Sequence, residues 1–241
     1  MTRRRWIADE VSGDRAALTG DHAGHLIRVL RAQVGQEFDI ACDTRVRQGR
    51  IVSLAEDRVE FELGSEVPAV TLSEISLLLS IFKFDRMEWA IEKCVELGVA
   101  RIIPVIARRT DPHLGAAAAK RVERWRRIAL QAAEQSRRSS TSSISPPVKL
   151  TEFLRTSAAG DSSLRIVLSE VQRQVQLRDL LESAPECEMV LAIGPEGGWA
   201  EDELQAFANA GWASVSLGPT ILRAETAAIA AVAIAMSELN P

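Results

Sequence analysis

The chain has 241 residues, of which 46% are hydrophobic and 26% are charged, so it is long enough to bury one large core or two modest ones. A net charge of −4 argues against a surface that is basic throughout, although basic residues gathered on one side could still bind nucleic acid. No stretch approaches the ~20 consecutive apolar residues of a membrane helix, and no apolar segment follows the basic start as in a secretory signal. We therefore expect a cytoplasmic protein that does not enter membranes.

Short strands with one solvent-facing side are predicted for residues 1–70. Polar and apolar residues alternate with a period of two at 37–41, 50–54 and 58–63, which is typical of a small sheet or barrel. Between 21 and 31 the apolar spacing is helical, and Pro68 lies where a linker is expected. This part of the chain therefore predicts a small, mostly β domain.

From residue 71 onward, buried strands alternate with helices. Nearly continuous apolar runs, typical of strands buried on both faces, lie at 75–82, 101–106, 164–168, 189–193 and 214–217. We expect a helix that Asp85 caps and Gly98 ends, and further helices at 116–135, 201–210 and 225–239. The alternation predicts an α/β domain built on a parallel sheet.

The cysteines, histidines and tryptophans do not organise a site. The three cysteines are isolated from one another, so we expect small buried hydrophobic residues rather than disulfides or a metal site. The three histidines lack the spacing of metal ligands or of a hydrolytic triad, and no metal is expected. The tryptophans are expected in the core, with Trp6, which follows three arginines, the best candidate among them for a nucleic-acid contact.

Three loops follow expected strands and are candidates for a ligand site: Ser169–Glu170, Gly194–Trp199 and Gly218–Glu225. In open α/β sheets, ligands bind beyond the carboxyl ends of the strands. The glycines of the middle loop allow a ligand to approach the backbone closely, although an ordinary tight turn would also explain them. Glu196 and the acidic start of the next helix would repel a phosphate, so a cationic or zwitterionic ligand fits better.

The segment Leu217–Ala227 combines unlike residues within a few positions. Arg223 and Glu225 flank the expected start of a helix, which a purely structural turn rarely requires. A capping role for Glu225 and Thr226 is the structural alternative.

Basic residues gather in several short clusters, which favours a surface divided by charge and able to bind RNA. The residues from which we expect RNA contacts are Arg3, Arg4, Arg5, Arg28, Arg31, Lys83, Arg108, Arg109 and Arg138.

Several motifs run in order along essentially the whole chain: His25–Arg31, Lys83–Trp89, Glu96–Gly98, Arg124–Trp125, Ala133–Ser136, Ile193–Gly198 and Leu217–Ala227. In this order they resemble the RsmE-type 16S ribosomal RNA uracil-N3 methyltransferases of the SPOUT superfamily. The Gly-Pro-Glu-Gly-Gly and Leu-Arg-x-Glu-Thr-Ala pair is specific, whereas the N-terminal segments are weaker.

The resemblance implies a PUA-like RNA-binding β-barrel domain at 1–70, followed at 71–241 by a SPOUT methyltransferase domain. In that class the C-terminal part is threaded into a deep trefoil knot, an exception to the usual absence of knots. The resemblance also implies a homodimer, S-adenosylmethionine bound in the knot, and one uridine of the small ribosomal subunit's 16S RNA as substrate.

Carried over by position, the resemblance assigns these residues to the cofactor site: Leu168, Glu170, Ile193, Gly194, Pro195, Gly197, Gly198, Leu217, Gly218, Ile221, Leu222 and Thr226. It places Arg223 and Glu225 near the transferred methyl group. Arg137 and Ser142 depart from the family, which usually has Gly and Pro there, and this leaves the conformation of loop 136–145 open.

Methylation at uridine N3 requires that the N3 proton be removed or the anion stabilised. We expect Arg223 to stabilise the developing anion, and Glu225 or Glu196 to orient the base or accept the proton. Two alternatives are a SPOUT methyltransferase for another ribosomal or transfer RNA position and a non-catalytic RNA-binding assembly factor. The residues at 194–198 and 223–226 favour an enzyme, because a protein that only binds RNA needs neither segment.

Overall fold

The structure, a computed structural model, describes residues 4–42, 45–68, 74–156, 163–172, 174–182 and 188–239. The chain divides into two compact units, one comprising Met1–Thr71 with Ala133–Thr141, and the other Leu72–Ala132 with Ser142–Pro241. None of the helices in the described ranges combines the length and apolar character that crossing a membrane requires.

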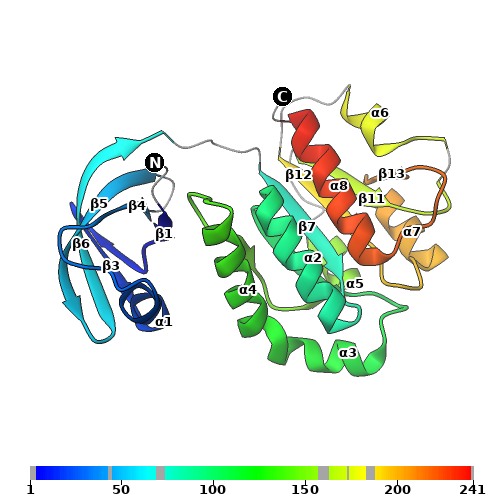
Figure 1. Ribbon diagram of the computed structural model, residues 1–241. Coiled ribbons are helices and arrows are strands. Elements are labelled where there is room, and N and C mark those ends of the chain that lie inside the picture. The colour runs from blue at the N-terminus through cyan, green and yellow to red at the C-terminus, as the bar shows by residue number, and fades with distance from the viewer. Residues whose placement is uncertain are drawn as a thin grey trace. The chain divides into compact units, whose positions relative to one another are not determined.

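The first unit is built on a curled sheet of six strands (Figure 1). In the order in which they pair, these are β1 (Arg5–Ile7), β4 (Glu37–Cys42), β5 (Arg45–Ala55), β6 (Arg58–Val67), β3 (Arg15–Thr19) and β2 (Glu10–Ser12). Neighbours pair antiparallel except β1 and β4, which are parallel. The alternating pattern correctly predicts β4, β5 and β6. The strands β1 to β3 are only three to five residues long and give no comparable signal.

A single hydrophobic core joins this sheet to the helical turns α1 (Gly20–Gly24) and η1 (His25–Val29), the latter a π-helix. Leu18, Leu26 and Phe61 are fully buried in it. Trp6 belongs to the same core at 7% exposure, with its ring 5.8 Å from that of His25. The expectation that Trp6 packs in the core is therefore confirmed, and its buried indole is poorly placed for the nucleic-acid contact considered for it.

The second unit contains a parallel sheet. Its pairing order is β10 (Val148–Lys149), β8 (Arg101–Ile106), β7 (Ile75–Ser80), β12 (Met189–Ile193), β11 (Leu164–Leu168) and β13 (Ala213–Val215), with β9 (Ser143–Ile144) also paired to β8. Every pairing in it is parallel. The central strands β7, β12 and β11 are almost wholly buried, as their apolar composition predicts. The expected α/β fold with a parallel sheet and a separate small β unit is confirmed.

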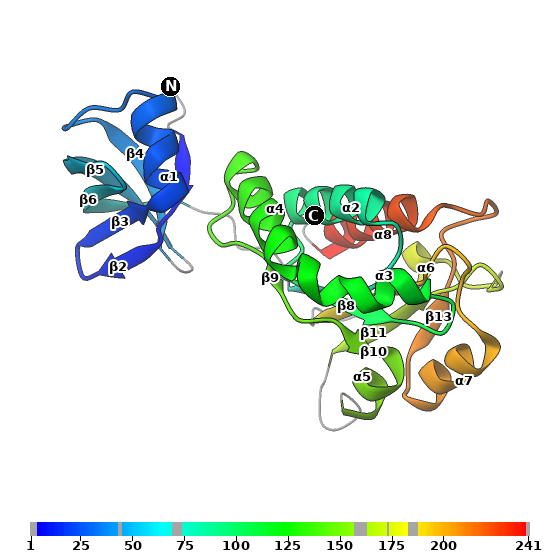
Figure 2. The ribbon, with the colours of Figure 1, turned by 90° about the horizontal axis from the view of Figure 1, so that it is seen from below.

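Helices cover both faces of this sheet (Figure 2). On one face α2 (Phe84–Leu97) packs beside α8 (Ala224–Leu239), and α6 (Leu177–Leu181) contacts α8; on the other α5 (Leu150–Thr156) lies beside α7 (Glu201–Asn209). Gly98 ends α2 at a φ of 115°, as predicted. Asp85 does not cap this helix. The N-cap is Lys83, and Asp85 lies in the first turn, where a carboxylate still interacts favourably with the helix dipole.

The single helix expected at 116–135 is instead three segments: α3 (Pro112–Ala117), the 3-10 helix η2 (Ala118–Arg121) and α4 (Val122–Gln135). Asp111 caps α3 by accepting a hydrogen bond of 2.8 Å from the backbone of His113. A run of alanines favours both kinds of helix and so gives no sign of the change. The predicted stripe is nevertheless correct, since Val122, Trp125 and Ala129 are buried.

Two side chains show how exposure depends on tertiary packing. Cys94 is buried as expected, and burial raises the pKa of its thiol to about 12, so it is unreactive near neutrality. Trp89 on the same helix was expected in the core, but 48% of it is exposed. Cys187 lies outside the described residues.

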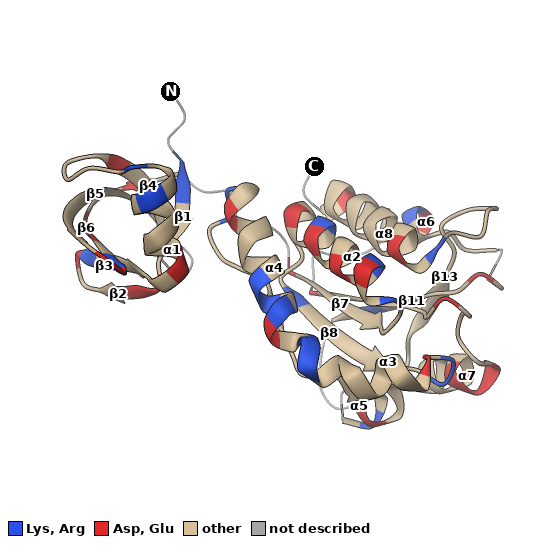
Figure 3. Cartoon of the chain, turned by 60° about the horizontal axis from the view of Figure 1, so that its bottom comes forward, with Lys and Arg blue, Asp and Glu red and all other residues tan. Residues whose placement is uncertain are grey.

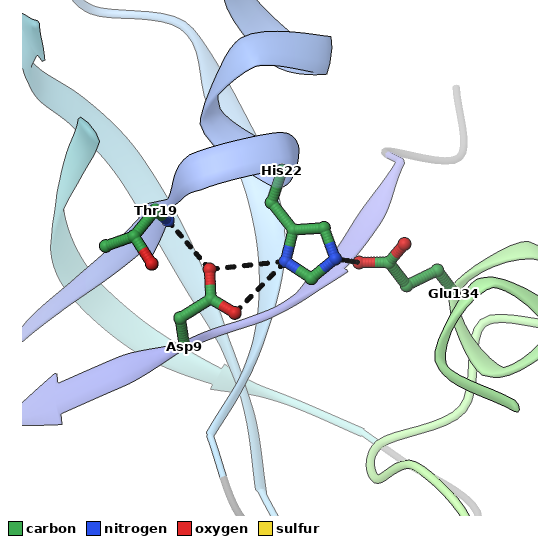
Figure 4. A network of polar contacts seen from close by, with 4 residues as sticks. All are labelled: Asp9, Thr19, His22 and Glu134. Carbon is green, nitrogen blue, oxygen red and sulfur yellow. Dashed lines mark hydrogen bonds and ion pairs between the residues drawn. The ribbon is translucent and has the colours of Figure 1, made fainter. Parts of the chain in front are cut away.

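A polar network within the first unit centres on His22 (Figure 4). Its Nδ1 lies 3.1 Å from Asp9 Oδ1, and its Nε2 lies 3.8 Å from Oε1 of Glu134. Asp9 also accepts a hydrogen bond of 2.7 Å from the backbone of Thr19. The hydrogen bond to Asp9 raises the pKa of His22 more than burial lowers it, and the charge of Glu134 raises it further. Burial in turn raises the pKa of Glu134.

The network makes stability depend on pH. Because the folded-state pKa of His22 lies above its unfolded value, its stabilising effect is complete below about pH 6.5 and is lost as pH rises through the raised pKa. We expect the free energy of unfolding of the native protein to fall over this range relative to that of His22→Gln, measured by urea denaturation. Although burial raises it, hydrogen bonds from His22 and Thr19 lower the pKa of Asp9 below its ordinary value, so Asp9 titrates well below this range. Parallel profiles for the two proteins would contradict the assignment.

Candidate functional site

A pocket of about 620 Å³ opens at the carboxyl ends of the parallel strands. Three loops form it, those that follow β11, β12 and β13, and these are the three loops that the sequence singles out. The ends of β11 and β12 are adjacent because these strands pair in register, and β13 pairs with β11 on its other side. The start of α8 completes the wall through Ala224 and Ala227.

The loop after β12 depends on glycine at one position in particular. Gly198 has a φ of +70°, a conformation that strains any other residue. A Cβ atom there would lie 2.6 Å from Oε1 of Glu170, so the side chain of this glutamate, from the loop after β11, lies close to the backbone of Gly198. The positive φ is what requires glycine at 198.

Trp199 connects the loop after β12 to the end of β11. Its Nε1 donates a hydrogen bond of 3.0 Å to the backbone carbonyl of Leu168, the last residue of β11. Its ring lies under Gly194, 3.3 Å from where a Cβ would be. The ring also packs edge-on against Phe207, with centroids 4.9 Å apart, in the core under α7. The pocket floor is thus part of the hydrophobic core.

Most of the expected cofactor residues lie on the pocket wall. Those that line it are Leu168, Glu170, Ile193, Gly194, Pro195, Gly198, Leu217, Gly218, Ile221 and Leu222. Gly197 and Thr226 do not. The carbonyl of Gly197 instead accepts a hydrogen bond of 2.8 Å from Nη1 of Arg109, and Thr226 is exposed on the first turn of α8.

The three expected catalytic residues occupy different environments. Glu196 lines the pocket, and 40% of its side chain is exposed. Glu225 is buried and lies off the wall. Arg223 is exposed, between the wall residues Leu222 and Ala224, and so stands at the rim.

Arg86 joins this group, although the sequence alone assigns it no role at the site. Its Nη1 donates a hydrogen bond of 2.9 Å to Oε1 of Glu196, and its Nε lies 3.8 Å from Oε1 of Glu225. Arg86 and Glu196 are 110 residues apart in the sequence. The motif 83–89 contains Arg86, but its carboxylate partners become neighbours only in the folded chain.

The charge of the pocket favours cations. Glu170 and Glu196 line it, and no lysine or arginine does among the residues that the structure describes. The rest of the wall combines apolar side chains and loop backbone with neutral polar residues, and such a wall can bind a largely planar organic ligand. The polar residues are Ser169, Gln172, Gln176, Ser216 and Thr220. No group of three or more possible metal ligands occurs in the described ranges.

The basic residues from which RNA contacts are expected are scattered. Arg4, Arg28, Arg31 and Lys83 are exposed. Arg3 lies outside the described residues.

Four others of this set are already engaged within the protein. One is Arg109, through its hydrogen bond to the carbonyl of Gly197. Arg5 donates to the carbonyl of Arg137 in the same unit and lies 4.0 Å from Asp39, so its side chain is largely committed to the fold. Arg108 pairs with Asp202 at the start of α7, and burial lowers the pKa of Arg138.

A further basic surface runs along η2 and the first turns of α4 (Figure 3). Part of its charge is already neutralised. Arg124 binds Glu88 through two hydrogen bonds of 2.7 and 2.8 Å, and Arg121 lies 3.8 Å from the same carboxylate.

Comparison with known proteins identifies the family to which the chain belongs. Residues 70–236 match the RNA methyltransferase domain family. A ribosomal RNA small subunit methyltransferase E from Synechocystis sp. is 31% identical over 218 residues, covering 90% of this chain and 71% of the relative. The protein of the same name from Aquifex aeolicus is 29% identical, covering 96% and 98%.

Solved structures agree. The crystal structure of a ribosomal RNA small subunit methyltransferase E from Neisseria gonorrhoeae, bound to S-adenosyl methionine, superposes with a TM-score of 0.83. It is 32% identical in sequence, and the match covers 97% of this chain and 96% of that one.

The anchoring of the pocket by Trp199 can be tested against a matched tryptophan. Trp212 lies in the same core, packs on the same phenylalanine with ring centroids 5.0 Å apart, and its buried Nε1 has no hydrogen-bond partner among the described residues. Trp199→Phe leaves a buried carbonyl without its donor, so it should lower the free energy of unfolding by about 1–2 kcal/mol more than Trp212→Phe. Denaturant titration of both variants measures the difference. Equal losses would show that the hydrogen bond does not matter.

Proposed function

We propose a reaction for this chain, which belongs to the ribosomal RNA small subunit methyltransferase E family of RNA methyltransferases. The protein transfers a methyl group from S-adenosylmethionine to ribosomal RNA of the small subunit, and the acceptor atom is N3 of a uridine. The choice of N3 comes from the motif resemblance, and the other parts come from the named relatives.

The observation that carries the proposal is the similarity of this chain to the Neisseria protein. That protein is bound to S-adenosyl methionine and matches nearly the whole of this chain. Here the glycine-rich loop after β12 and the loops after β11 and β13 enclose a pocket of about 620 Å³, within the range of small-molecule sites.

The residues present fit this cofactor. The pocket has two carboxylates and no basic side chain on its described wall, which suits a sulfonium cation and disfavours a phosphate. Leu168, Ile193 and Leu217 offer apolar contacts, and the backbone around Gly194 and Gly218 offers hydrogen bonds to an adenine ring. S-adenosylmethionine supplies an electrophilic methyl group, whose bond to sulfur breaks as the bond from uracil N3 forms.

The side chains around the pocket then handle charge and position. Glu196 faces the pocket and can accept the N3 proton, so that the nitrogen lone pair is free to attack. Arg223 at the rim can stabilise the negative charge that develops on the uracil oxygens. The base must leave its stack to reach a recessed site, which single-stranded RNA allows most easily.

We assign RNA binding to the small N-terminal unit, residues 1–70, as a PUA-like domain, and catalysis to the SPOUT domain of residues 71–241. The exposed Arg4, Arg28 and Arg31 support the first assignment because exposed cations can bind phosphates. A threaded C-terminal knot remains a prediction from the resemblance.

The role of Arg223 leads to a kinetic prediction. Arg223→Ala should lower turnover on small ribosomal subunits by ~10²–10³-fold, because a donor to a developing anion acts mainly in the transition state. Binding of S-adenosylmethionine, measured by calorimetry, should change little.

Mass spectrometry of the digested RNA should find 3-methyluridine as the product. Arg178→Ala serves as control, since this exposed arginine of α6 forms ion pairs with Glu182 and Glu238 and does not line the pocket. No binding of S-adenosylmethionine to the native protein would instead favour an RNA-binding assembly factor. A different methylated nucleoside would overturn the choice of N3.

We propose further that the protein acts as a homodimer. Trp89 on α2 is 48% exposed, and the neighbouring helix α8 carries the half-buried apolar residues Ile229, Ala230 and Ile234. Exposed aromatic and aliphatic side chains of this kind are enriched in homodimer interfaces.

Light scattering after size exclusion tests the interface. Trp89→Glu should convert the dimer to a monomer, because a carboxylate buried between subunits would have no counter-charge. Val29→Glu is the matched control, since Val29 is 64% exposed but belongs to the first unit. A monomeric native protein, or a Trp89→Glu variant that remains dimeric, would contradict the proposal.

A further inference from the structure

Two carboxylates, Glu196 and Glu225, lie near the reacting position, and the structure distinguishes between them. Glu196 lines the pocket and is 40% exposed, so it can reach a bound base. The side chain of Glu225 is only 8% exposed and does not line the pocket. A group that accepts a proton from the substrate must come within hydrogen-bond reach of it. Glu196 is therefore better placed than Glu225 to accept a proton from the substrate.

The negative charge of the buried Glu225 must be compensated by a neighbouring group. Its Oε2 is buried and has no hydrogen-bond partner among the described residues. A buried carboxylate is costly unless a cation or dipole neutralises it. Arg86 supplies the cation, with its Nε 3.8 Å from Oε1 of Glu225, and the N-terminus of α8 adds a favourable dipole.

The same guanidinium holds both acids. Through Nη1 it donates a hydrogen bond of 2.9 Å to Glu196, and through Nε it faces Glu225. A planar guanidinium can bridge two carboxylates in fixed directions, which a lysine ammonium on its flexible chain cannot do. Arg86 thereby links the first turn of α2 to the loop after β12 and to the first turn of α8.

We infer that Arg86 is a positioning residue of the methyl-transfer site. Glu225, which lies off the pocket wall, orients Arg86, and Arg86 in turn holds Glu196 at the pocket, where Glu196 is the proton acceptor. This inference rests on the proposed function. The N3 proton passes to the carboxylate of Glu196, and the N3 lone pair forms the new bond to the methyl carbon while the electrons of the methyl–sulfur bond remain on sulfur. Glu225 takes no proton from the substrate.

Single-turnover methylation of small ribosomal subunits tests the roles of the two carboxylates. Glu196→Gln should lose ~10²-fold or more in rate, because it cannot accept the proton. Glu225→Gln, which keeps the shape and removes only the charge, should lower the rate far less than Glu196→Gln, because it loosens the orientation of Arg86 and leaves the proton acceptor in place. The opposite ranking of these two variants would overturn the assignment of the acceptor.

Arg86→Gln should lower the rate by ~10²-fold, through misplacement of Glu196, while the affinity for S-adenosylmethionine stays within a few-fold. Arg86→Lys should restore stability more than the rate, since it returns the charge without the bridge.

Lys93→Gln is the matched control. Lys93 lies on the same helix and also binds two glutamates, at 2.7 and 2.8 Å, but these contacts are remote from the pocket wall. An Arg86→Gln variant that behaves like Lys93→Gln would overturn the inference.

The double variant Arg86→Gln with Glu225→Gln separates positioning from folding. It removes the unpaired buried charge, so the stability lost in Arg86→Gln should return while the rate stays low. Recovery of both would make Arg86 a purely structural counter-ion and overturn the inference. A native protein that binds no S-adenosylmethionine would instead contradict the proposed function itself, which keeps the two failures distinct.

Discussion

The geometry of the site depends on how the carboxyl ends of the neighbouring strands β11 and β12 are held together. β11 and β12 pair in register, and the hydrogen bond from Trp199 to the carbonyl of Leu168 fixes the loop after one strand against the end of the other. Because the tryptophan ring is also packed into the core under α7, a shift of either loop would disturb well-packed side chains. A pocket with such a floor is largely formed before any ligand arrives.

The electrostatics of the site follow from this fixed frame. The loop after β12 presents Glu196 to the pocket, and α8 starts close enough to bring Glu225 behind it. Two neighbouring carboxylates would repel each other unless a cation lay between them, and α2 provides that cation as Arg86. The acidic wall attracts a sulfonium, while the positive charge that balances it is kept off the wall.

The sequence predicts well those features that depend on the pattern of neighbouring residues. Buried strands and the loops that follow them could be located because parallel sheets place ligands at strand ends. Partners far apart in the chain could not be found this way. Trp199 is correctly expected to be buried, but its hydrogen bond reaches back 31 residues. Arg86 belongs to a recognised motif, yet its function depends on a carboxylate 110 residues away. Nor could the pattern show that Thr226 faces away from the pocket.

The position of Arg86 also bears on how the protein is made. Synthesis proceeds from the N-terminus, so the strand β7 and the helix that carries this arginine leave the ribosome long before the loop with Glu196 or the start of α8. A nascent chain can form the small β unit early, apart from Ala133–Thr141, but the guanidinium has no counter-charge at the site until the later segments arrive. Until then the chain cannot hold a cofactor or modify RNA. An unfinished copy is therefore inert, and the ribosome that makes the protein is not exposed to a partly formed enzyme.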